Sequence, residues 1–215
     1  MDIKQAVARL NSQLPLKSRQ NQLGQELKLV HQSVLQSLVN NGRPPTLTEL
    51  IYFLNKDEIE IGIQKLAYND LVVLDAARKN IVGAYPLTIE QTPHQLTVNG
   101  QSIFAMCALD ALSVAPMFNT AVQIETRCHV TQTAIIINMR DSEILDAQPS
   151  LDIRVGVRWQ MPTGAAAHSM CLEMVFLLDE QIALQWQNGD VENTSLFTLP
   201  EAVEFGSEFF TPLLK

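Results

Sequence analysis

Cysteines and aromatic residues are scarce in this chain, which has 3 Cys among 215 residues and only 6% Phe, Trp and Tyr. An odd number of cysteines leaves at least one thiol unpaired, so a framework made only of disulfides is excluded. No two cysteines form a C-x-x-C pair, the pattern typical of thioredoxin-type redox sites and zinc ribbons. We therefore expect free thiols, as in a protein of a reducing compartment.

Positive charge and long hydrophobic runs are scarce as well. The 15 lysines and arginines face 23 aspartates and glutamates, which gives a net charge of −8. Such an acidic protein is a poor match for a polyanion such as DNA. Residues 1–20 lack the apolar core of a secretory signal, and no segment is long and apolar enough to span a membrane. The sequence thus predicts a soluble cytoplasmic protein, a monomer or weak dimer, with neither nucleic-acid nor membrane partners.

Three catalytic signatures are also missing: the H-E-x-x-H of zinc peptidases, the G-x-S-x-G of serine hydrolases and a glycine loop that cradles phosphate. Histidine occurs at four scattered positions, which are His31, His94, His129 and His168. His168 precedes Cys171 by three residues and could polarise its thiol, although a lone histidine is more often structural. A cysteine hydrolase that pairs Cys107 with His129 or His168 stays an alternative, because nothing in the spacing decides it.

The first 85 residues are expected to form a helical module. Hydrophobic residues make up 47% of the chain, enough for one medium domain with a small appendage. Apolar spacing predicts helices near 30–41, 46–54 and 56–69 and a strand hairpin over 71–85. This order is that of a winged helix, a fold often used on DNA. The third helix is acidic, with Asp57, Glu58 and Glu60 against Lys56 and Lys65. We therefore expect this module to pack against the rest of the protein rather than to bind DNA.

Strands dominate the second part of the chain. Asn99-Gly100 is a strong hairpin signal between strands 95–98 and 102–105. A short helix from Cys107 is expected to end before Pro116. Strands 121–130 and 134–139 and a polar connection over 141–150 follow. A similar order then recurs: strand 151–160, an ambiguous apolar run 165–178, helix 179–187, strand 195–199 and a last helix from Pro200. The sequence thus predicts an α+β fold with a hint of duplication.

Cys107-Ala108-Leu109-Asp110 is the motif with the clearest chemistry. It places a thiol and a carboxylate on the first turn, and on one face, of the helix that begins there. Unpaired N–H groups and the positive end of the helix dipole favour a thiolate, so a lowered pKa of Cys107 is expected. Cys128, inside an apolar strand, is expected to be inert filler. The chemistry depends on whether the fold brings the distant Cys171 to Cys107.

The nonapeptide Phe104–Leu112 closely resembles the core motif of the organomercurial (alkylmercury) lyases. The similarity covers most of the chain and continues at Gly42–Pro44, Thr126–His129, Ser169–Cys171 and Pro200–Phe209. It implies a winged-helix-like three-helix module over residues 1–85 and a catalytic core over 86–215, built from two β-β-α-β repeats with small antiparallel sheets. It also implies an activity, cleavage of the carbon–mercury bond to give a hydrocarbon and Hg(II).

Carried over residue by residue, the resemblance implies that Cys107 and Cys171 bind mercury and that Asp110 transfers the proton. Mercury is then substrate and product, and no cofactor is implied. Cys128 matches a third family cysteine that is thought to be structural. Small organomercurials are the implied ligands, with cellular thiols or a mercuric reductase as acceptors of the Hg(II) product.

Two positions depart from the family pattern. Met106 stands where relatives often have an aromatic residue, and Leu172 stands where some have another cysteine, which could alter pocket shape or product release. We expect an apolar pocket lined by Phe104, Met106 and Leu109, which would raise the pKa of Asp110. A non-catalytic, thiol-based metal sensor or metal-binding protein on the same scaffold stays the main alternative.

Overall fold

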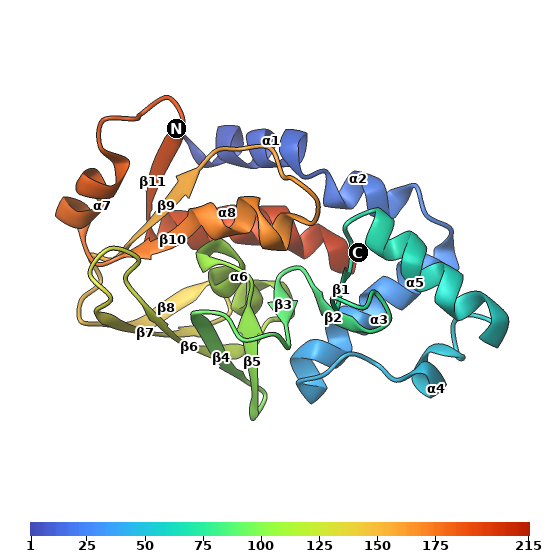
Figure 1. Ribbon diagram of the computed structural model, residues 1–215. Coiled ribbons are helices and arrows are strands. Elements are labelled where there is room, and N and C mark those ends of the chain that lie inside the picture. Colours follow the sequence, from blue (N-terminus) through green and yellow to red (C-terminus); the bar gives the residue numbers. More distant parts are fainter.

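Two antiparallel sheets and the helices packed on them form the structure, a computed structural model that describes residues 1–215 (Figure 1). The larger sheet has the strand order β1-β2-β3-β5-β4-β6-β7-β8. Its strands are β1 (Val73–Leu74), β2 (Ile81–Ala84), β3 (Leu87–Thr88), β4 (His94–Val98), β5 (Gln101–Ala105), β6 (Ala121–Arg127), β7 (Ala134–Arg140) and β8 (Glu143–Gln148). The smaller sheet has the order β10-β9-β11, with β9 (Arg154–Arg158), β10 (Met174–Leu177) and β11 (Thr194–Thr198). This mixture confirms the predicted α+β class.

The helices come from both ends of the chain. The α-helices are α1 (Ile3–Gln13), α2 (Leu16–Asn21), α3 (Gln25–Asn41), α4 (Leu47–Leu50), α5 (Ile59–Tyr68), α6 (Ala108–Phe118), α7 (Glu180–Gln187) and α8 (Leu199–Phe210). Short 3₁₀ turns are η1 (Lys56–Glu58), η2 (Ala166–His168), η3 (Met170–Glu173) and η4 (Thr211–Leu214). Helix α6 packs against β5, β6 and α8, and α8 in turn contacts α1 and the smaller sheet (Figure 1). No helix combines the length and the apolar character that a membrane crossing requires.

The second part of the chain is a structural duplication. In the first repeat, β4 is the central strand, and β5 and β6 pair with it on either side, with α6 between them in sequence. In the second repeat, β9 is central between β10 and β11, with α7 between them in sequence. All four pairings are antiparallel, so the two units share one topology. This confirms the two β-β-α-β repeats that the family resemblance implied.

The N-terminal helices follow the sequence pattern only in part. Helix α3 ends at Gly42, whose φ of +64° is the left-handed conformation that glycine adopts without strain. Thr46 caps α4 reciprocally with Glu49, but this helix has a single turn and is shorter than expected. Helices α1 and α2 were not predicted, although Asp2 and Gln5 form a capping box at the start of α1.

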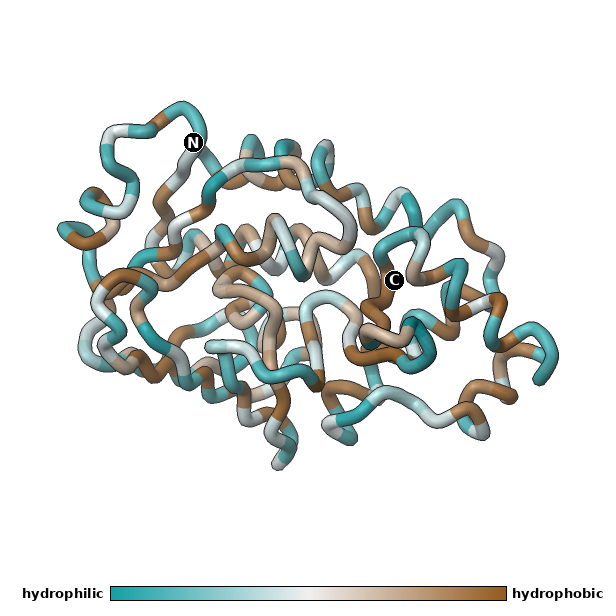
Figure 2. The backbone as a smooth tube through the Cα atoms, viewed as in Figure 1, coloured by the Kyte–Doolittle hydropathy of each residue, from teal (hydrophilic) through white to brown (hydrophobic).

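One hydrophobic core spans the predicted boundary near residue 86. A single cluster of 60 buried residues includes members of α1, α3 and α5 as well as of α6 and α8. The β1–β2 hairpin joins the larger sheet through β3, and α3 packs on β2, β3 and β5. Hydrophobic stretches lie along the central helices and strands, and many outer turns are hydrophilic (Figure 2). A division into two folding units at this boundary stays a prediction.

Two local predictions were wrong. Helix α6 continues through Pro116 and ends only at Asn119, which has a φ of +50°. Every residue from Ala108 to Met117 is buried, and this packing outweighs the roughly 3 kcal/mol that proline costs inside a helix. The supposed connection 141–150 contains β8, a strand at the sheet edge in which only Ala147 is buried. A strand that is mostly exposed shows little of the hydrophobic alternation by which strands are recognised.

Candidate active site

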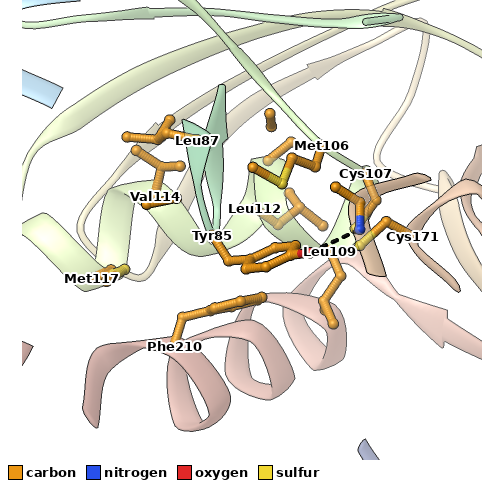
Figure 3. Packing of buried hydrophobic residues seen from close by; sticks show 14 of the residues in the cluster. Tyr85, Leu87, Met106, Cys107, Leu109, Leu112, Val114, Met117, Cys171 and Phe210 are labelled. Atoms are coloured by element: carbon orange, nitrogen blue, oxygen red, sulfur yellow. Dashed lines mark hydrogen bonds between the residues drawn. The ribbon is translucent and has the colours of Figure 1, made fainter. Parts of the chain in front are cut away.

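Cys107, Asp110 and Cys171 come together in the interior of the protein. One ligand atom from each, two Sγ atoms and a carboxylate oxygen, all lie within 4.8 Å of one another. The three residues are 1%, 1% and 4% exposed, and the two cysteines lie side by side (Figure 3). This confirms that the fold brings Cys171 to Cys107. Two sulfurs and one oxygen around a small space are a donor set that can hold a metal ion.

The junction of β5 and α6 sets the positions of Cys107 and Asp110. Strand β5 ends at Ala105, and Cys107 is the N-cap of α6, with extended backbone (φ −154°, ψ 179°). Its Sγ accepts a hydrogen bond from the Asp110 N–H at 3.3 Å. This bond satisfies one of the unpaired N–H groups at the helix start and places the carboxylate on the same side as the thiol. In the C-x-x-D pattern, Cys107 thus caps the helix and also lies next to the Asp110 carboxylate.

A hydrogen-bond network from the N-terminal part holds the loop that carries Cys171. The Tyr85 hydroxyl donates to Asp70 Oδ1 at 2.9 Å and accepts from the Ala167 N–H at 2.8 Å, and the second of these bonds is the dashed line in Figure 3. Asp70 Oδ2 accepts from the Ala166 N–H at 3.1 Å. Cys171 follows in η3, directly before β10. Two buried polar side chains therefore fix the backbone that leads to the second thiol.

Tyr85→Phe is expected to lower the free energy of unfolding by about 1–3 kcal/mol, because it leaves the Ala167 N–H and Asp70 Oδ1 without a partner in the interior. Urea denaturation measures the difference. Tyr68→Phe is the matched control, since Tyr68 is 89% exposed and its hydroxyl makes no hydrogen bond. Equal stability of the two variants would contradict a supporting role for this network.

Burial controls the protonation of the three groups. Both carboxylate oxygens of Asp110 are inaccessible and accept no hydrogen bond of good geometry. Burial raises the pKa of Asp110 to about 7, although the Cys107 and Cys171 thiols favour its charged form. Burial likewise raises the pKa of Cys107 well above its usual range, and the Cys171 thiol and the Asp110 charge add to this. The expected lowering of the Cys107 pKa by the helix N-terminus is therefore wrong, because desolvation outweighs the dipole.

The second thiol has a smaller shift. The neighbouring Cys107 thiol lowers the pKa of Cys171, but burial and the Asp110 charge together outweigh this and leave the pKa raised. In the resting protein both cysteines are thus protonated at neutral pH. Each thiol group therefore carries a proton before substrate binds.

Two cavities lie near the cluster and share Pro93, Met106 and Leu172 as lining residues. Cys171 lines the second, whereas Cys107 and Asp110 lie behind the wall and line neither. The first has a volume of about 220 Å³. The second has about 140 Å³, and Cys171 and Met174 are part of its wall. A cavity of about 150 Å³ holds benzene in another protein, so the second cavity is large enough for a small alkyl or aryl group. Met106 is thus in the pocket, as expected.

The expected roles of Phe104 and Leu109 in the pocket are wrong. Ile103 and Ala105 of β5 point into the core, so Phe104 between them faces the other side of the sheet, where it lines a groove with Gln95. Leu109 is fully buried and lines neither cavity. The pocket wall instead includes Met174, Val175 and Phe176 of β10.

No histidine bonds to either cysteine of the cluster. His168 is exposed, and its Nε2 lies 3.7 Å from the Glu90 carboxylate. His129 is exposed as well. The hydrogen bonds of the Cys107 thiol go to Met174 and Asp110. The cysteine hydrolase alternative requires an imidazole on Cys107, and therefore has no support.

Cys128 lies outside the cluster. It is fully buried after β6, and its Sγ accepts a hydrogen bond from the Thr131 N–H at 3.4 Å. A structural role for this residue stays a prediction.

Comparisons with known proteins agree with this geometry. The family model of MerB, alkylmercury lyase, matches residues 87–211. Alkylmercury lyases of Bacillus cereus and Clostridium butyricum are each 26% identical over 185 residues, which is 86% of this chain and 81% of theirs. The crystal structure of the mercury-bound form of MerB2 superposes with a TM-score of 0.77 and 22% identity, covering 93% of this chain and 98% of that one. At this identity the superposition shows a shared fold.

Proposed function

Because the chain belongs to the alkylmercury lyase family and is a carbon–mercury lyase, we propose that it cleaves organomercurials by protonolysis at Cys107, Asp110 and Cys171. The convergence of these three groups within 4.8 Å supports the proposal. In this reaction the two thiolates bind mercury, and the carboxyl group transfers a proton to carbon. The products are a hydrocarbon and Hg(II).

The soft character of sulfur explains the choice of ligand. Hg(II) is a soft cation with a filled d shell, and thiolate is the softest ligand that protein side chains offer. Two sulfurs bound to one ion at about the 2.3 Å of a metal–thiolate bond lie about 3.8 Å apart in tetrahedral geometry and about 4.6 Å apart on opposite sides of the ion. The observed spacing of up to 4.8 Å is compatible with both sulfurs binding one mercury atom.

The protons needed for the reaction come from the thiols themselves. Cys107 first replaces the counter-ligand of the organomercurial, and its proton leaves with that ligand. Cys171 then binds the same mercury atom and gives its proton to Asp110. Donation from two sulfurs makes the bound carbon basic, and Asp110 protonates it as the carbon–mercury bond breaks. One thiol proton ends on the hydrocarbon, and Hg(II) stays between the two thiolates.

The raised pKa values suit this sequence of steps. A carboxyl group with a pKa of about 7 accepts and donates a proton near neutral pH, the condition for efficient acid–base catalysis. The burial of all three groups strengthens the attraction between thiolates and the metal. Small thiols, or a mercuric reductase, then accept the Hg(II), and no further cofactor is needed.

The direct test measures hydrocarbon from purified protein with phenylmercury and an excess of small thiol. We expect benzene in the headspace in amounts that exceed the protein several-fold. Protein without phenylmercury and phenylmercury with thiol alone are the controls. Stoichiometric mercury binding without benzene would instead favour the non-catalytic metal-binding alternative.

A further inference from the structure

A third sulfur lies at the mercury site. The Cys107 thiol donates a hydrogen bond to the Met174 thioether, with Sγ and Sδ 3.7 Å apart. Met174 is 3% exposed and lines the same cavity as Cys171. Its side chain thus faces both the first thiol and the space in which substrate is expected to bind.

Regular structure fixes the backbone positions of Cys107 and Met174, the two residues that carry these sulfurs. Cys107 is the N-cap of α6, and Met174 is the first residue of β10, where it pairs with Val157 of β9. Helix α6 also packs against β10. Neither sulfur therefore depends on a mobile loop for its place.

The distance between these sulfurs suits a shared metal ion. Two sulfurs bound to one ion at about 2.3 Å in tetrahedral geometry lie about 3.8 Å apart. The Cys107 S–H bond is directed at Met174 Sδ. A cation that replaces this proton therefore lies on the side of Cys107 that faces Met174. Thioether sulfur is a soft ligand and binds soft cations without losing a proton.

We propose that Met174 is a third sulfur ligand of the Hg(II) product, so that the ion is held by Cys107, Cys171 and Met174 until external thiols remove it. This inference depends on the proposed function in one respect, which is that the lyase reaction produces the Hg(II) ion. A neutral third ligand adds affinity without adding charge in a buried site. Its consequence is slower release of Hg(II), which protects the cell from a reactive ion before an acceptor arrives.

The test uses inorganic Hg(II) and does not depend on turnover. Wild type, Met174→Leu and Met117→Leu are each loaded with one equivalent of Hg(II) and titrated with dithiothreitol. Met117 is the matched control, because it is also buried but lies at the far end of α6 from the two cysteines (Figure 3). We expect Met174→Leu to lose the ion at about tenfold lower dithiothreitol, the lower end of what losing a supporting group does at protein metal sites. Met117→Leu should behave as wild type.

X-ray absorption of the mercury-loaded protein grown with selenomethionine gives a second readout that needs no variant to fold. A mercury–selenium distance in wild type, absent from the Met174→Leu protein, is the expected result. Two sulfur neighbours without selenium, or unchanged retention in a folded Met174→Leu variant, would overturn the inference. The phenylmercury assay separates the two claims, since an Hg–Se contact without benzene refutes the lyase mechanism alone.

Discussion

Asp110→Asn is expected to retain mercury and to release almost no hydrocarbon. The amide has the shape of the carboxyl group but cannot carry a proton from Cys171 to carbon. Loss of a positioned acid slows a reaction by about 10²–10⁴-fold, and we expect benzene formation from phenylmercury to fall within this range. Both sulfur ligands remain, so the variant should hold the organomercurial as a stable protein adduct.

Two measurements on the same sample check this. Headspace analysis gives the rate of benzene formation, and mass spectrometry of the intact protein shows whether phenylmercury stays bound. Glu90→Gln is the control for the loss of an acidic group near the pocket, since Glu90 lines the first cavity and pairs only with the exposed His168. Benzene release by Asp110→Asn at the wild-type rate would remove Asp110 from the reaction.

The pH dependence of the free energy of unfolding, compared between Asp110→Asn and wild type, measures the protonation of Asp110. The pKa of Asp110 is about 7 in the folded protein and near 3.8 in the unfolded chain. Between these values the folded state binds a proton that the unfolded state lacks, so rising pH favours unfolding of wild type. Relative to wild type, Asp110→Asn should gain stability from pH 4 to 7, on the order of 4 kcal/mol at the upper end. Buried His31 and His94, with pKa values of about 4, are present in both proteins and cancel in the difference.

Turn and capping residues made much of the fold predictable. Gly42, Asn99-Gly100 and Asn188 ended or connected elements where expected, because few residues adopt their backbone conformations. Elements without such a signal were missed or misplaced. Pro116 lies in a helix that burial stabilises on all sides, and β8 has only one buried residue. Packing decides the structure of α6 and pairing with β7 decides that of β8, and single residues encode neither.

In the site, too, residues close together in the sequence were predictable, and residues that only the fold brings together were not. The Cys107–Asp110 pair was visible because both residues lie on one helical turn. The approach of Cys171 was expected from the family resemblance alone, since no spacing rule links residues 64 positions apart. Tyr85, Asp70 and Met174 were not recognised as parts of the site. The sulfur-rich stretch Met170-Cys171-x-x-Met174 was the one available signal for the third sulfur.

The pKa of Cys107 illustrates a prediction that failed for a physical reason. The helix N-terminus favours the thiolate by up to about 2 kcal/mol, whereas complete burial penalises it by more. Sequence indicates the helix start but not the depth of burial. A protonated resting thiol is also better suited to the proposed reaction, in which each of the two thiols gives up a proton in every turnover.

Serine in place of each cysteine is expected to separate catalysis from folding. Cys107→Ser and Cys171→Ser should each reduce benzene formation by roughly 10⁴-fold or more, because neutral hydroxyl oxygen is a poor ligand for a soft cation and the reaction needs both sulfurs. Cys128→Ser should retain the wild-type rate. Its expected effect is a loss of about 1–3 kcal/mol in the free energy of unfolding, because a hydroxyl group replaces a thiol in a fully buried position.

Stability of the Cys107 variant gives the sharpest contrast. Serine is among the preferred N-cap residues, and the Cys107 sulfur makes only a long 3.3 Å bond to the Asp110 N–H. Because the better helix cap offsets part of the cost of burying a hydroxyl group, Cys107→Ser should lose less stability in urea than Cys128→Ser while losing turnover. A residue whose replacement improves a helix cap and abolishes the reaction is retained for its chemistry. Loss of turnover in a fully folded Cys128→Ser variant would show instead that the third cysteine takes part in the reaction.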